Sequence, residues 1–413
     1  MTHSTQFTEH SLFENYKQHC NAQHIEYLRR YGLLKIIKEA SCAEIIDSNN
    51  KSYIDFVAGY GIFNIGHNHP KVIRELIREL DSNSGWNRPF LNEPHINFMH
   101  ALVDITGGKM DKVFICSTGA EAVDTALKFT RLITGKSHII SATGAFHGYT
   151  IGAISVSGIP RQVTPFAPLL TDITHVPYGD IDALKNEITD KTAAVILEPV
   201  QAEIGAIDPP NGYMKKVNEL CNEKEVLFIV DEVRTGVGRT GTFFAVQEEG
   251  FYPDMLIAGK SLGGGIVPVG ALLTTSKHWK RFEYSFAMSA SSFAGNRLTS
   301  VAGMKVLEIM KDENILHNAV TIGNVLKEGF GVLVEKFPHL YSKLTGRGML
   351  LGLHCRSKLI TDKVVQGCVE KGLLIAPAFC NPACILIEPP LVLSEEQVDN
   401  GLEIINDVCS NIN

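Results

Sequence analysis

The sequence lacks the cysteine spacing of a disulfide-bonded protein. Its nine cysteines are an odd number, form no CxxC pair and lie scattered from Cys20 to Cys409, with only Cys380 and Cys384 close together. Small secreted proteins that depend on disulfides carry dense, paired cysteines instead. The opening residues, MTHSTQFTEHS, also lack the basic start and apolar run of a secretory signal. We therefore expect reduced thiols and a cytoplasmic location.

The sequence also has no basic excess and no long apolar run. Its 38 Lys and Arg against 45 Asp and Glu leave a net charge of −7, which disfavours binding to nucleic acid or to anionic membranes. The longest stretch without charge, 137–160, is interrupted by Gly, Ser, Thr and two His. No segment offers the ~20 apolar residues that a membrane-spanning helix needs. We expect neither a nucleic-acid nor a membrane partner.

What the sequence does contain is the composition of a large globular protein. It has 413 residues, of which 45% are hydrophobic and 20% charged. A chain of this size buries about three quarters of its unfolded surface, and its length suggests two or three domains. No internal repeat, low-complexity tract or linker divides it.

Short apolar runs alternate with helical patterns through the middle of the chain. The runs are VFIC, HIIS, AAVILEP, VLFIVDE, MLIAG and VGALLTT, all between Val113 and Thr275. Such alternation predicts an α/β fold with a largely parallel sheet flanked by helices. The spacing over 13–40 is compatible with a helix, and 43–56 reads as a hairpin turning at Asn49 and Asn50.

The C-terminal part reads as a separate α+β unit that packs with the N-terminal segment, because neither looks self-sufficient. We therefore expect a small α+β domain built from both chain ends. The boundaries predicted are 1–59 for the N-terminal segment of the small domain, 60–299 for the large domain and 300–413 for the C-terminal small domain.

Four of the predicted strands end in unusual polar residues. Ligands sit at the carboxyl ends of strands in an open parallel sheet, so these residues describe a candidate site. They are the segments 117–121 (STGAE), 198–201 (EPVQ), 231–234 (DEVR) and 259–261 (GKS).

The first of these segments places Gly119 and Ala120 at the start of a predicted helix. Free backbone N–H groups and a partial positive charge favour a phosphate there, and small residues let the anion approach. The alternative is an ordinary capping box, with Thr118 as the cap and Glu121 three residues later.

Asp231 and Lys260 each close a strongly apolar strand. A buried carboxylate must meet a cation or a donor, either in a site or in a structural ion pair. The AGKS sequence resembles a nucleotide-binding P-loop, but the first glycine of that motif would fall at Asp254, so the motif fails. A lysine desolvated by apolar walls becomes a nucleophile toward an aldehyde, although a surface loop is the ordinary role of a Gly-Lys pair.

A phosphate cradle, a buried acid and a nucleophilic lysine together match pyridoxal 5'-phosphate. Its aldehyde condenses with Lys260, Asp231 keeps the pyridine nitrogen protonated, and the ring accepts the electrons of a carbanion. Phe146 can stack on one face of the ring and Val233 can press on the other, the alternative for Phe146 being plain core packing.

Eight stretches, taken in order, resemble the class III aminotransferases of pyridoxal phosphate fold type I. The resemblance runs from about Ala43 to Ile405. The stretches are FVAGYGIFNIGHNHPKVI, STGAEAVDTALKFTR, GAFHGYT, ILEPVQAEIG, FIVDEVRTGVGRTGTFFA, AGKSLGGGIVPVGA, SSFAGN and IEPPL. The ordered set is specific, whereas each piece alone is weak. The resemblance implies a seven-stranded, mostly parallel sheet in the large domain.

The resemblance also implies roles for individual residues. Lys260 and Asp231 are the catalytic pair, and Ser292 stands where the family has Thr, whose hydroxyl reaches the phosphate of the neighbouring subunit. A homodimer with active sites at the subunit interface is therefore expected. The expected cofactor-binding residues are Thr118, Gly119, Ala120, Phe146, His147, Glu198, Asp231, Val233, Arg234, Lys260 and Ser292, with Gln201 as support. No metal site is expected, because His67 and His69 match a family loop without a metal.

The sequence departs from the family where relatives similar to ornithine aminotransferase hold glutamate with two arginines. Tyr149 and Leu386 stand in those positions, and neither can replace a guanidinium as the partner of a carboxylate. With Leu386 in place, Glu203 is left to face a substrate ammonium or solvent. Arg234 replaces the common Gln beside the cofactor. Arg234, Arg88 or Arg297 could restore carboxylate binding, although a structural role is the ordinary one.

These observations predict a ping-pong aminotransferase acting through a Schiff base at Lys260. It would use a terminal amine or amino acid as donor and an aldehyde or ketone as acceptor, without the usual two-arginine clamp. The alternative on the same scaffold is an aminomutase, an amino-acid racemase or an ammonia lyase. A cofactor-binding regulator without catalysis is the third hypothesis.

Overall fold

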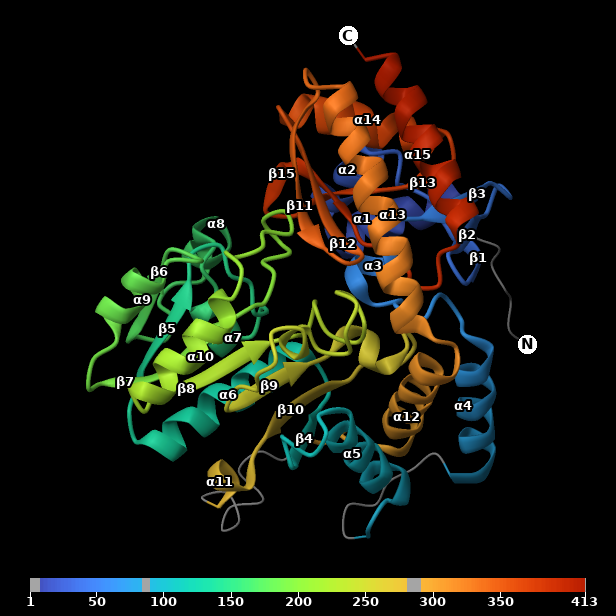
Figure 1. The fold of residues 1–413 in the computed structure, drawn as a ribbon. Helices are drawn as coiled ribbons and strands as arrows, with labels where there is room; N and C mark the ends of the chain where they lie inside the picture. Colours follow the sequence, from blue (N-terminus) through green and yellow to red (C-terminus); the bar gives the residue numbers. More distant parts are fainter. Residues whose placement is uncertain (1–7, 84–89, 281–290, 413) are drawn as a thin grey trace.

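The chain folds into a large sheet-centred part and a smaller part made from both chain ends (Figure 1). The computed structural model describes residues 8–83, 90–280 and 291–412. In Figure 1 the blue N-terminal strands lie beside the red and orange C-terminal elements, while the green and yellow elements form the large part.

The large part is organised around a seven-stranded sheet with the order β4-β10-β9-β8-β7-β5-β6. Its strands are β4 (Lys112–Cys116), β5 (His138–Ala142), β6 (Ile173–Val176), β7 (Thr192–Leu197), β8 (Leu227–Asp231), β9 (Met255–Ala258) and β10 (Gly270–Thr274). β10 runs antiparallel to β4 and β9, and the other neighbours pair in parallel. All residues of the four central strands, β7 to β10, are buried, as expected when helices cover both faces. The predicted α/β fold with a mostly parallel seven-stranded sheet is confirmed.

The helices follow the strands as the apolar spacing predicts. Those of the large part are α4 (Pro70–Asn83), α5 (Glu93–Ile105), α6 (Gly119–Thr134), α7 (Ile151–Val156), α8 (Pro160–Val163), α9 (Ile181–Glu187), α10 (Tyr213–Glu223), α11 (Ser276–Trp279) and α12 (Arg297–Asp312), with 3-10 turns η1 (Thr164–Phe166), η2 (Ala245–Gln247) and η3 (Lys260–Gly263). The long α6 buries Ala122, Ala126 and Phe129.

The smaller part joins the two ends of the chain through one sheet. β1 (Ile37–Ser41), β2 (Glu44–Asp47) and β3 (Ser52–Asp55) pair antiparallel, and β13 (Leu373–Leu374) adds to β3 in parallel. A second sheet has the order β11-β12-β15-β14. Its strands are β11 (Tyr341–Arg347), β12 (Leu350–Cys355), β14 (Ala376–Ala378) and β15 (Asn381–Ile387), and the helices are α13 (Ile315–Lys336), α14 (Lys358–Glu370) and α15 (Glu395–Ser410). The expected α+β unit from both chain ends is confirmed.

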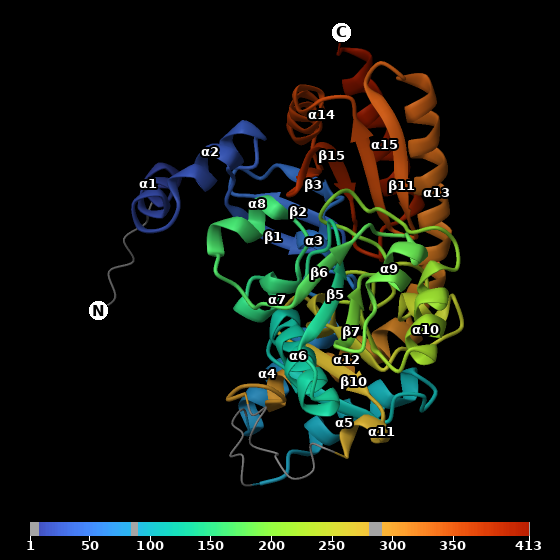
Figure 2. The same cartoon turned by 90° about the vertical axis from the view of Figure 1, so that its left-hand side faces the viewer.

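Two details of the sequence prediction are wrong. The helical pattern over 13–40 is in fact α1 (Glu9–His19), α2 (Ala22–Arg30) and then β1, because Asn21 caps a new helix and the chain turns extended before residue 37. Figure 2 shows α1 projecting away from the rest of the chain, and α1 buries no residue, whereas α2 buries Ile25. β6 was missed because only its last residue is buried, so its sequence carries no apolar run. The hairpin at 43–56 is present as β2 and β3.

The short helix α3 (Ala58–Gly61) connects the two parts at the carboxyl ends of the large sheet. Its Gly61 carbonyl accepts a hydrogen bond of 2.7 Å from the hydroxyl of Ser261, next to the end of β9. Gly59 and Tyr60 both have left-handed backbones, with φ of 60° and 61°. Among the helices within the described ranges, none is long and apolar enough to cross a membrane.

Candidate active site

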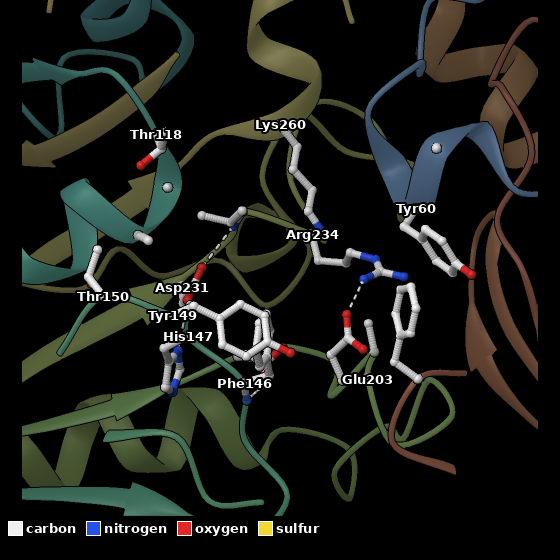
Figure 3. Close-up of a pocket in the computed structure, with 18 residues that line it drawn as sticks. Tyr60, Thr118, Phe146, His147, Tyr149, Thr150, Glu203, Asp231, Arg234 and Lys260 are labelled. Carbon is white, nitrogen blue, oxygen red and sulfur yellow. Dashed lines mark hydrogen bonds and ion pairs between the residues drawn. The ribbon is translucent and has the colours of Figure 1, made fainter. Parts of the chain in front are cut away.

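A cavity of about 850 Å³ opens where β4, β7, β8 and β9 end (Figure 3). It brings together residues from strand ends, from the start of α6 and from the smaller part. Its lining residues are Gly59, Tyr60, Thr118, Gly119, Ala120, Phe146, His147, Gly148, Tyr149, Thr150, Glu198, Ala202, Glu203, Asp231, Val233, Arg234, Lys260 and Phe379. The sequence-predicted strand-end residues thus meet at one place.

The start of α6 forms one wall of the cavity. Thr118 is the N-cap and accepts from the Glu121 N–H at 3.1 Å, while the Glu121 carboxylate accepts from the Ser117 N–H at 2.7 Å. Thr118 therefore caps α6, but the capping box is incomplete because Glu121 accepts from the residue before the cap and not from the Thr118 N–H. These contacts do not use the N–H groups of Gly119 and Ala120, which lie in the first turn and have no intrahelical acceptor. Capping and anion binding are compatible here.

Gly119 is required by the packing of this wall. A Cβ at this position would lie 2.7 Å from Cγ2 of Val233, closer than side chains approach one another. The absence of a side chain lets α6 approach the segment that follows β8, and it keeps Val233 at the cavity wall.

Asp231 ends β8 and is only 4% exposed. One carboxylate oxygen, Oδ2, accepts a hydrogen bond of 2.7 Å from Nδ1 of His147, and the other accepts 3.0 Å from the Val233 N–H. The other ring nitrogen of His147, Nε2, is buried and has no hydrogen-bond partner among the described residues. His147 therefore positions Asp231, a role that sequence reasoning did not identify because 84 residues separate the pair.

Glu198 is a second buried acid beside Asp231. Burial, followed by the negative charge of Asp231, raises the pKa of Glu198 well above its usual range. Its Oε1 accepts a hydrogen bond of 2.9 Å from the backbone N–H of Phe146. Glu198 thus holds the loop that carries Phe146, and its raised pKa favours the uncharged form. Gln201 lies behind the cavity wall and donates to the Thr143 carbonyl at 3.1 Å.

Lys260 begins the turn after β9 with a left-handed backbone, φ 46°. This conformation is uncommon for a residue with a side chain and costs free energy, so the surrounding structure must hold it. Burial, followed by the positive charge of Arg234, lowers the pKa of Lys260 from 10.5 to about 8. In Figure 3 the lysine side chain extends toward Arg234. A considerable fraction of neutral, nucleophilic amine is therefore available near neutral pH.

Arg234 lies between two buried carboxylates. Its Nε and Nη2 form a two-pronged pair with Glu388, at 2.8 and 2.7 Å, and its Nη1 donates to Oε1 of Glu203 at 2.7 Å. The two charges raise the pKa of Arg234 above its already high value. Arg234 therefore occupies Oε1 of Glu203, and this oxygen does not face solvent. Glu388 was missed by sequence reasoning, although a lone acid ending the apolar β15 in ILIEPP was a usable signal.

An aromatic wall from the smaller part closes the cavity beside Arg234. The rings of Tyr60 and Phe379 lie 4.5 Å apart, and the Arg234 guanidinium lies 5.8 Å from the centre of the Tyr60 ring. On the opposite side Phe146 meets Tyr149 edge to face at 5.1 Å. Tyr149 is 62% exposed, and its hydroxyl accepts from Gln162 at 3.0 Å. Sequence reasoning missed Tyr60 and Phe379.

Three other candidate residues that the structure describes do not line the cavity. Leu386 is 2% exposed in an apolar cluster with Ala202 and Cys384. Arg297 pairs with Glu79, and Ser292 is exposed. Arg88 lies outside the described residues.

The two histidines of the GHNHP stretch serve the fold. Nε2 of His67 lies 2.7 Å from Asp55, and Nε2 of His69 lies 3.3 Å from Glu313. In the part of the chain that the structure describes, no group of three or more His, Cys, Asp or Glu could hold a metal ion.

Comparison with known proteins covers nearly the whole chain. A family model described as aminotransferase class-III matches residues 28–409. Two structures of the ornithine aminotransferase from Toxoplasma gondii are 29% identical with TM-scores of 0.90; they cover 98% and 97% of this chain and 96% and 94% of theirs. One of them is described with partial occupancy of PLP at the active site. An acetylornithine aminotransferase from Elizabethkingia anophelis is 28% identical with a TM-score of 0.85, over 98% of this chain and 100% of that one.

Proposed function

Because the chain belongs to the class-III aminotransferases and is a pyridoxal-phosphate-dependent enzyme of that family, we propose that it transfers the amino group of a terminal amine to an aldehyde or ketone. We further propose that it does so without a pair of arginines holding an α-carboxylate. The supporting observation is that Arg234 is the one arginine among the described residues lining the cavity, and that both Glu388 and Glu203 occupy its guanidinium.

The residues of the cavity fit the cofactor. The N–H groups of Gly119 and Ala120, with the Thr118 cap, would hold its phosphate at the start of α6. Asp231 would pair with the ring nitrogen, and Phe146 and Val233 would enclose the two faces. The close approach of Val233 to Gly119, where a Cβ would not fit, keeps this wall narrow enough to enclose a flat ring.

The chemistry divides between the cofactor and the chain. When bound, pyridoxal phosphate accepts the electrons left on the substrate carbon after a proton departs. Lys260 would hold the cofactor through its neutral amine, and its Nζ is the group of this chain that would move a proton to and from the substrate carbon. Asp231, fixed by His147, would keep a proton on the ring nitrogen of the cofactor. Glu198 holds the Phe146 loop in place by accepting from its backbone N–H.

A half-reaction experiment tests this function. The purified holoenzyme is mixed with single amines, and the loss of the visible absorption band of the lysine-bound cofactor is followed; keto acids and aldehydes are then added to restore it. The proposal requires that some terminal amine bleaches the band and that an external acceptor restores it, with a Lys260→Ala variant inactive in both steps. Conversion of the amine to an isomer or to an alkene, without any acceptor that restores the band, would instead indicate an aminomutase, a racemase or an ammonia lyase.

The proposed assembly is a homodimer whose active sites lie at the subunit interface. Large apolar side chains around α4, α5 and α12 support it: Leu80, Leu91 and Phe293 are 55%, 91% and 75% exposed. A lone subunit would keep these side chains in water. Ser292, next to Phe293, is exposed and would face the neighbouring cavity. Sedimentation at micromolar concentration should give a mass of two chains, and a single-chain mass would contradict the assembly.

The proposed location is the cytoplasm, and the proposed domain boundaries are 1–59, 60–299 and 300–413. The last boundary falls inside α12, a helix that packs on α4 and α5 of the large part. All nine cysteines are free, which suits a reducing compartment. Cell fractionation tests the location, and limited proteolysis followed by mass spectrometry tests the boundaries.

A further inference from the structure

Arg234 pairs with two buried carboxylates. One guanidinium faces two carboxylates, those of Glu203 and Glu388, and all three side chains are at least nine-tenths buried. The two-pronged pair with Glu388 already uses the geometry by which an arginine best binds a carboxylate. With all three groups ionised, these three side chains sum to one negative charge, and the buried Lys260 and Arg239 also interact electrostatically with Glu388.

One oxygen of this cluster has no donor. Oε2 of Glu203 is buried and has no hydrogen-bond partner among the described residues, while Oε1 accepts from Arg234. Glu203 lines the cavity and is 7% exposed. A buried acceptor left unpaired is costly, so a ligand that brings a donor to Oε2 gains more than one that does not.

The same arrangement determines whether the substrate group bound here is negatively or positively charged. A substrate carboxylate would have to displace Glu203 or Glu388 from Arg234 and leave a buried carboxylate without its cation. A substrate ammonium would instead supply a donor to an unpaired carboxylate oxygen and leave both ion pairs of Arg234 in place. The rings of Tyr60 and Phe379 beside the cluster offer apolar surface to the methylenes of such a substrate, and an aromatic face favours a cation.

We propose that Glu203 is a specificity-determining residue that binds a second ammonium group of the donor substrate, so that the preferred donors are diamines or polyamines. This inference rests on the proposed function. One amine of the donor reacts at Lys260 while the other donates to Oε2 of Glu203. Figure 3 shows both residues facing the same cavity with Arg234 between them.

The experiment compares donors of equal length that differ only in the remote group. Bleaching of the holoenzyme is measured with 1,3-diaminopropane, 1,4-diaminobutane and 1,5-diaminopentane, with the matching n-alkylamines, and with 4-aminobutanoate. The best diamine should exceed its n-alkylamine by roughly tenfold or more in the second-order rate, the size of effect that a charge-assisted hydrogen bond gives. 4-Aminobutanoate should be the poorest donor.

Two variants separate Glu203 from general charge effects. Glu203→Gln keeps an oxygen for Arg234 but removes the charge, and it should bring the diamine-to-monoamine ratio to within about threefold of one. Glu219→Gln makes the same chemical change on the exposed face of α10 and should retain the wild-type ratio. A ratio unchanged in Glu203→Gln, or equal rates for diamines and monoamines in the wild type, would overturn the inference. The wild-type comparison decides even if Glu203→Gln does not fold.

A binding measurement distinguishes failure of this inference from failure of the proposed function. 1,4-Diaminobutane should raise the melting temperature of the wild-type holoenzyme more than butylamine does, and this difference should disappear in Glu203→Gln. If no amine bleaches the enzyme but the difference is present, the aminotransferase proposal fails and Glu203 still binds the second ammonium. If amines bleach the enzyme and no difference exists, only the Glu203 inference fails.

Discussion

Nδ1 of His147 lies 2.7 Å from Oδ2 of Asp231, and both side chains are almost fully buried. His147 thus fixes the position of Asp231, the acid that is proposed to pair with the ring nitrogen of the cofactor. Because the Val233 N–H holds the other oxygen, the carboxylate has one orientation.

Removing this hydrogen bond should weaken catalysis more than folding. In His147→Leu, Asp231 loses a charge-assisted hydrogen bond and its fixed orientation, and we expect kcat to fall by about tenfold or more. His147→Asn, which retains a nearby N–H donor, should recover part of the loss. The pH dependence of the cofactor absorption band should also shift in His147→Leu. A variant that loses stability but keeps both kcat and this pH profile would show that the histidine is purely structural.

Arg234 should be essential for stability because it compensates two buried carboxylates. In Arg234→Gln both Glu203 and Glu388 lose their cation, and the free energy of unfolding should decrease by about 3–5 kcal/mol. Urea denaturation measures the change. The double variant Arg234→Gln/Glu388→Gln removes one of the uncompensated charges and should be more stable than the single variant. Equal or lower stability of the double variant would contradict a purely electrostatic cause.

The lowered pKa of Lys260 predicts how cofactor uptake depends on pH. Only the neutral amine attacks an aldehyde, and the pKa of about 8 lies below the ordinary 10.5. The rate at which cofactor-free protein takes up pyridoxal phosphate should therefore rise with pH through a midpoint near 8 and then level off. Free lysine in the same buffers supplies the control, since its rate should go on rising toward its own pKa. A midpoint for the protein near 10.5 would show that burial does not act on Lys260 as described.

Gly119 should not tolerate a side chain. In Gly119→Ala the new Cβ would collide with Val233, and we expect a loss of about 1–3 kcal/mol in stability together with weaker cofactor binding. Gly331→Ala is the matched control: this glycine lies within α13, and a Cβ there meets nothing within 4 Å. Alanine should stabilise that helix by up to about 1 kcal/mol. Calorimetric melting and cofactor titration of both variants provide the comparison.

The sequence by itself determined the sheet and the residues at its edge. Apolar runs specify buried strands, and parallel strands bring their carboxyl ends to the same edge, so Asp231, Lys260 and Gly119 could be placed together before any coordinates. The order of the motifs then indicated the family. β6 was not predicted because a strand that is largely unburied has no apolar pattern in its sequence.

Tertiary structure alone decided the partners of the charged side chains. Arg234 and Glu388 are 154 residues apart, and they meet only because the fold brings the end of β15 in the smaller part beside the segment that follows β8. Residue spacing within an element predicts a face, but it carries no information about which distant element covers that face. For this reason the sequence left Glu203 facing an ammonium or solvent, whereas the fold gives Arg234 to one of its oxygens and leaves the other buried without a partner among the described residues.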